Sequence, residues 1–243
     1  MPEQLPFTAL LNRLFAGPVT AGLHAIHVNP KYPHAPISNA VSMQVLVVII
    51  LVVLAIILRL RLSVDRPGAM QHLAESTHEF FSGMGRELIG HDYQPFLPYI
   101  TALGVYILAC CLIGLVPSFE SPTATPAVPL GCALATFIYY NFHGLKHHGP
   151  GYIKQFMGPV LLLAPLIFVI EVVSHLARIL SLTVRLFANM FAGEMVTLAF
   201  FSLIPLVVPI AFMGLHIFVA LIQTYIFVLL TCVYLGAAVS HEH

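Results

Sequence analysis

Residues 37–58 (ISNAVSMQVLVVIILVVLAIIL) contain no charged side chain. About 20 consecutive apolar residues make a helix long enough to cross a hydrocarbon core of roughly 30 Å, so this run predicts a membrane span. The rest of the chain agrees, because only 8% of its 243 residues are charged and 59% are hydrophobic. Soluble domains have roughly 25% charged residues. We therefore expect an all-α integral membrane protein.

Composition also limits the function. The net charge is zero at pH 7, so no bulk attraction to nucleic acid is expected. The four cysteines lie in apolar runs and form no CxxC motif, which argues against a disulfide framework or a thiolate zinc site. They are Cys110, Cys111, Cys132 and Cys232. We expect no cofactor and no metal.

The charges between the apolar runs predict the topology. Residues 1–36 lack the pattern of a signal peptide and are interpreted as an extracytoplasmic segment. The arginines that follow the first span place its end in the cytoplasm by the positive-inside rule. They are Arg59, Arg61 and Arg66. Two further spans are predicted at 98–116 and 127–145, with the lysine-containing loop after them in the cytoplasm.

Residues 67–90 have the pattern of an amphipathic helix. Apolar residues recur at three- and four-residue steps, and glutamates and an arginine fill the other side. Such a helix is too polar to cross and suits the cytoplasmic membrane interface. Packing of this helix on a partner is the alternative.

The last ninety residues form two long apolar stretches, 165–203 and 210–240, interrupted by Pro205 and Pro209. As helices they would be about 45 to 57 Å long, which exceeds the hydrocarbon core. We expect a steeply tilted helical hairpin folded about Ile204–Pro205. The membrane domain would then cover 37–243 with about five crossings and a cytoplasmic C-terminus.

Polar residues mark one face of the first long helix and meet polar residues of the second. Folding at 204–205 brings Arg185 level with Gln223 and Glu194 level with His216. Glu194 lies nine residues after Arg185, about 900° of helical rotation, so it points to the opposite face. Glu171 lies near the cytoplasmic side. The sequence therefore predicts a polar route on each side of a central arginine.

The residue types suit proton transfer. Arginine stays protonated at physiological pH and does not exchange protons, whereas glutamate and histidine side chains can. A fixed positive charge favours the ionised form of a carboxylate brought close to it and repels a passing proton. Centring an arginine in a bilayer costs roughly 3 kcal/mol on insertion scales, so its presence indicates function.

These motifs resemble those of a known family. The stretch SHLARILSLTVRLFANMFAGE, with LHIFVALIQTYIFVLLTCVYL, NFHG and GLVPSFESPT, is similar to subunit a of the F-type ATP synthase from about residue 40 onward. RLFxNMxAGE is a highly specific signature of that family. Ala188 and Ile179 stand where glycine and proline are commoner, and both changes concern packing.

The resemblance implies a membrane stator with no covalent chemistry of its own. Its tilted hairpin would lie along the rotating c-ring, and two offset half-channels would meet near one essential arginine, here Arg185. Asn189, Glu194 and His216 would line the outer half-channel, Gln223 would support the arginine, and Glu171 would be the inner carboxylate. The implied partners are the c-ring, subunit b of the peripheral stalk and lipid, in a bacterial inner membrane. The implied ion is H⁺, with Na⁺ not excluded.

Some assignments stay open. Ser174, His175, Arg178 and Ser181 are candidates for lining the inner channel, although Arg178 could instead reach lipid headgroups. The sequence does not give the ring's subunit number, the stalk contacts or the role of residues 143–148.

Three rival interpretations fit the sequence less well. The spacing of His143, His147 and His148 matches one histidine box of membrane di-iron oxidases and desaturases, but no second box follows. A proton-coupled secondary transporter would show inverted repeats, and none is found. The third interpretation gives the buried charges only a structural role, as contacts between helices. A structural role would not require four ionisable groups at graded depths.

Overall fold

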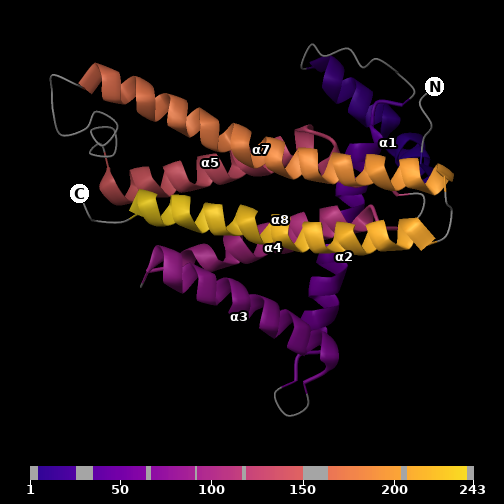
Figure 1. The fold of residues 1–243 in the computed structure, drawn as a ribbon, viewed down its shortest axis with the longest axis horizontal. Helices are drawn as coiled ribbons and strands as arrows, with labels where there is room; N and C mark the ends of the chain where they lie inside the picture. Colours follow the sequence, from indigo (N-terminus) through magenta and orange to yellow (C-terminus); the bar gives the residue numbers. More distant parts are fainter. Residues whose placement is uncertain are drawn as a thin grey trace.

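The computed structural model describes residues 5–25, 35–63, 67–90, 92–116, 119–149, 164–203 and 207–239. Within these ranges every regular element is helical, which confirms the expected all-α class. The expected hairpin fold at Ile204–Pro205 lies outside the described residues. Most helices run along the long axis of the molecule, and α2 runs across them (Figure 1).

The N-terminal part contains two helices, α1 (Pro6–Ala25) and α2 (Asn39–Leu60). The Ser38 side chain caps α2 by accepting from the Val41 N–H, as serine does at helix N-termini. Asn12 fastens α1 to the start of α2, because its amide both donates to the Ile37 carbonyl and accepts from the Ile37 N–H. The segment that was expected only as extramembrane chain is therefore largely helical.

Helix α3 (Ala69–Ile89) occupies the region of the predicted amphipathic helix. It packs on α4 and α8 through Phe81 and Met84, which are buried, while Leu73 and Phe80 stay exposed. Gly104 of α4 lets the Phe81 ring contact its backbone directly. The helix is thus fixed to the bundle along one side and presents apolar side chains along another.

Two 3₁₀ turns and two helices form the middle of the chain. After η1 (Gln94–Phe96) come α4 (Leu97–Ile113), η2 (Pro122–Ala124) and α5 (Ala127–His148). The α4 and α5 helices are joined by a stacked tyrosine pair, Tyr99 and Tyr139, whose ring centroids are 3.9 Å apart. The short η2 contacts α7 and so reaches the last hairpin.

The last two helices are the longest. Helix α7 (Ala164–Leu203) has 40 residues and α8 (Val207–Val239) has 33, which corresponds to about 60 and 50 Å. They run side by side along the long axis (Figure 1). Pro209 was expected to lie between the two long helices, yet it lies in the first turn of α8. A proline is tolerated there because the first N–H groups of a helix have no intrahelical acceptor.

In the described part of the chain, four helical stretches are long and apolar enough to cross a membrane: Asn39–Leu60, Gln94–Ile113, Leu166–Phe200 and Ile210–Val239. Helix α5 is not among them. The bundle core combines α4, α7 and α8 through buried residues such as Ile107, Leu186, Met190, Ala220 and Phe227. Large apolar side chains remain exposed on α2, α7 and α8, as lipid contact requires.

Candidate functional site

Arg185 lies in the middle of α7 and is half-buried. Its Nη2 donates to the Ser181 hydroxyl, one turn earlier on the same helix, at 3.4 Å. The neighbouring positions on this side, Ser181, Ala188 and Ala192, are small and exposed. The guanidinium therefore stands on a face with little side-chain bulk around it, which a second helix could approach closely.

Asn189 links α7 to α8. Its Nδ2 donates to Oε1 of Gln223 at 2.9 Å, and Gln223 is only 3% exposed. The sequence predicts Gln223 as the support of Arg185, but the recorded partner is Asn189, one turn further along α7. The physical reason is that Arg185 turns back along its own helix to Ser181, which leaves the neutral amides to pair with each other.

Glu194 faces the end of α4 and the start of η2. Its Oε1 accepts from the backbone N–H of Ser121 at 2.9 Å. Gly114, just after α4, approaches the same oxygen so closely that a Cβ there would lie 3.1 Å from it. The carboxylate is therefore held against the loop between α4 and α5.

His216 of α8 is buried next to the same end of α4. Its Nε2 lies 3.4 Å from the Cys111 carbonyl oxygen, and its Nδ1 would lie 3.0 Å from a Cβ on Gly193. Gly193 directly precedes Glu194 in the chain. The structure thus brings Glu194 and His216 against one turn of α4, and both need a glycine beside them.

The opposite end of α7 carries a second ionisable group. His175 Nδ1 lies 3.4 Å from Oε1 of Glu171 and 3.0 Å from its carbonyl oxygen. The His175 ring is buried against Phe137 and Tyr140 of α5.

Two further candidates of this region have distinct surroundings. The Arg178 guanidinium lies over the Tyr234 ring of α8 at 5.0 Å, a cation–π contact. Arg178 therefore contacts α8 and does not simply extend along α7. Ser174 is half-buried on the same helix.

Sequence reasoning missed two residues of this arrangement: Gly114 and Ser121. Ser121 is 73 positions from Glu194 and acts through its backbone, so no side-chain pattern identifies it. Gly114 gives no signal either, because its role is the space it leaves.

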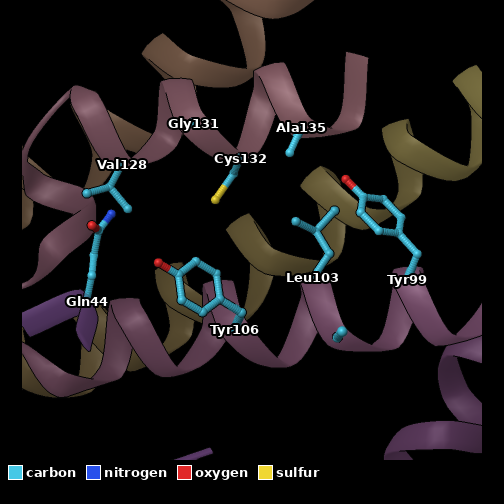
Figure 2. A pocket seen from close by; sticks show the side chains of 9 residues that line it. Gln44, Tyr99, Leu103, Tyr106, Val128, Gly131, Cys132 and Ala135 are labelled. Atoms are coloured by element: carbon cyan, nitrogen blue, oxygen red, sulfur yellow. The ribbon is translucent and has the colours of Figure 1, made fainter. Parts of the chain in front are cut away.

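A separate groove lies between α2, α4 and α5 (Figure 2). It has a volume of about 400 Å³, and Tyr106, Cys132 and the Gln44 amide lie around it. Its lining includes no residue of the long hairpin, so it is distinct from the groups described above.

The first histidine of the suspected box, His143, lies among aromatic rings. His143 stacks edge-on against Phe96 at 5.0 Å and also contacts Tyr139 and Phe142. Within the described ranges, no group of three or more His, Cys, Asp or Glu side chains could hold a metal ion.

The helices and these groups together define a multi-pass membrane protein with a permanent cation on an open face of α7 and ionisable side chains packed between its helices. The comparisons with known proteins identify the family. Residues 40–236 match the family model described as ATP synthase A chain. The chain therefore belongs to the ATP synthase A chain family, and its function is proton translocation in the membrane sector, coupled to ATP synthesis.

Similarity to individual relatives extends over most of the chain. ATP synthase subunit a of Koribacter versatilis is 58% identical over 244 residues and covers 100% of both chains. The same subunit of Solibacter usitatus is 54% identical over 86% of this chain and 90% of its own. That of Citrifermentans bemidjiense is 41% identical over 73% of this chain and 77% of its own.

Proposed function

We propose that protons move along two offset half-channels that meet at Arg185. The observation that carries this proposal is the order of groups along α7. Glu194 lies about 14 Å from Arg185 toward one end, and Glu171 lies about 21 Å from it toward the other. A non-titrating cation thus separates two sets of groups that can exchange protons.

The outer route uses His216, Glu194 and Asn189. A proton that enters from outside passes these side chains and protonates a carboxylate on the rotating c-ring. The neutral carboxylate can then face lipid, because removing its charge removes most of the cost of burial in hydrocarbon. After almost a full turn it releases its proton past Glu171 on the cytoplasmic side.

Arg185 keeps the two routes apart. Its positive charge holds the facing ring carboxylate ionised until it has moved to the outer route, and it repels a proton that would cross directly. The Asn189–Gln223 hydrogen bond fixes α7 to α8 one turn away. The small exposed residues around the arginine leave room for the ring helix to come close.

The chain acts as a stator and carries out no covalent chemistry. Its partners are the c-ring, subunit b of the peripheral stalk and the lipid of a bacterial inner membrane. We propose five crossings, made by α2, α4, α5, α7 and α8, with an outer N-terminus and a cytoplasmic C-terminus. The arginines after α2 support this orientation.

Replacement of the arginine tests the proposal. Arg185→Ala should abolish ATP-driven acidification of inverted membrane vesicles, because nothing then holds the ring carboxylate ionised. Arg59→Ala, which removes an exposed cation at the end of α2, is the control and should pump normally. Vesicles of the Arg185 variant that still acidify would contradict the gate.

A further inference from the structure

The loop that receives Glu194 is rigidly anchored to α4. The Ser121 hydroxyl donates to the Cys110 carbonyl at 2.9 Å and pairs with the Thr123 hydroxyl at 2.7 Å. Ser121 and Thr123 are 2% and 1% exposed. With the side chain engaged in this way, the backbone N–H of Ser121 is the group that points to the carboxylate.

There is also little free space around the hydrogen bond between Ser121 and Glu194. A Cβ on Gly114 would lie 2.8 Å from the Ser121 Cβ, 3.1 Å from the Ser121 nitrogen and 3.1 Å from Oε1 of Glu194. Real Cβ contacts are essentially never as short as 2.8 Å, and 3.1 Å is tighter than most, so a side chain at position 114 must push the serine or the carboxylate away. Gly114 thereby permits the hydrogen bond between them.

We infer that the Ser121 N–H is a positioning group for the outer half-channel, and that it fixes the Glu194 carboxylate in the place from which it passes protons. This inference rests on the proposed function. A backbone N–H donates and never accepts a proton, so it keeps Oε1 of Glu194 as an acceptor in both protonation states. The proton that Glu194 takes up and releases is therefore carried on its other oxygen.

The geometry offers a matched pair of substitutions. Ser121 has φ −69°, which is the value that proline adopts. Ser121→Ala and Ser121→Pro both remove the hydroxyl and keep this backbone angle, but only the proline variant removes the N–H. The difference between them therefore reports on the loss of the N–H together with the proline ring carbon that takes its place beside Oε1 of Glu194.

We expect proton-driven ATP synthesis in Ser121→Pro vesicles to be about ten-fold slower than in Ser121→Ala vesicles, as for a lost hydrogen bond to a charged group. The second readout is the dependence of synthesis on external pH. A merely structural loop defect lowers the rate by one factor at every external pH. Loss of a donor to a titrating carboxylate changes the shape of the profile. Equal rates and superimposable profiles would overturn the inference.

If the proline variant does not assemble, Gly114→Ala is a second test of whether the Ser121 N–H positions Glu194. It keeps both donors of Ser121 but displaces the serine or the carboxylate and so disturbs the hydrogen bond between them, and it should therefore also slow synthesis and alter the external-pH profile. Gly131→Ala on α5 is its control, because a Cβ there meets no atom within 4 Å. An unaltered profile in an assembled Gly114→Ala complex would overturn the inference.

Glu194→Gln separates this inference from the proposed function. If that variant makes ATP at the native rate, Glu194 is not on the proton route and both ideas fail. If Glu194→Gln is slow but the two Ser121 variants are indistinguishable, the route stands and only the role of the Ser121 N–H is wrong.

Discussion

At the scale of residues, Arg185 owes its role to what surrounds it. A charge at the centre of a bilayer is costly, by roughly 3 kcal/mol on insertion scales, and such groups usually find a buried partner. In the structure its described hydrogen bond is a long one to a serine hydroxyl, and the guanidinium stays half-exposed. The charge is therefore left available for a carboxylate that approaches from outside the subunit.

The Asn189–Gln223 hydrogen bond can be tested as a coupled pair. Gln223→Leu keeps the volume but leaves the Asn189 amide unpaired between the helices, so pumping should fall several-fold. The combined loss in the double variant Asn189→Ala/Gln223→Leu should be smaller than the two single losses together, because both single changes remove the same interhelical hydrogen bond, worth about 1 kcal/mol. ATP-driven acidification measures both. Strictly additive losses would show that the amides act independently.

At the scale of elements, helix α3 is held against the hairpin through its contacts with α8. The Leu88 carbonyl of α3 contacts the backbone of α8 directly at Gly236. The contact depends on the absence of a side chain at that position, as in other close helix crossings in membranes. It holds α3 against the last helix near its C-terminal end.

Gly236→Ala should therefore separate α3 from α8. Since the blocking atom belongs to the backbone, the clash cannot be relieved by a rotamer change, and overpacking of this kind costs about 1–3 kcal/mol. Gly214→Ala on the same helix is the control, because a Cβ there meets nothing within 4 Å. Thermal unfolding of the detergent-solubilised complex should occur at lower temperature in the first variant only.

At the scale of the whole molecule, the directions of α2 and of the hairpin helices α7 and α8 limit how the protein can lie in a membrane. Helix α2 runs across α7 and α8 (Figure 1), so one spanning helix and two much longer helices do not share a direction. Helices of about 50 to 60 Å cannot stand upright in a core of roughly 30 Å without protruding. Their exposed apolar sides indicate that lipid or other subunits cover them.

The proposed contact with the c-ring can be tested by cross-linking. A photoreactive maleimide on Ala188→Cys should link to the ring, because position 188 is exposed beside Arg185. The control Ile138→Cys is 65% exposed on α5 and should give no ring adduct. The native cysteines at positions 110, 111, 132 and 232 are buried and should not react. Ring adducts from position 138 alone would contradict the proposed face.

Hydropathy alone determined that this is an all-helical membrane protein, and the family signature around Arg185 was readable in the sequence. Both follow from local facts: how many apolar residues a bilayer requires, and which side chains stand in one helix. The helix start at Val207 was not readable because Pro209 reads as a helix breaker, although a proline is tolerated in a first turn. The fold of residues 6–25 was not readable because Asn12 bonds to Ile37, 25 positions away. Tertiary structure alone decided that Gln223 pairs with Asn189 and that Ser121 holds Glu194. Those contacts join residues 34 and 73 positions apart in the chain. The second uses the backbone N–H of Ser121, a group that every residue except proline has, so the residue type gives no hint of it.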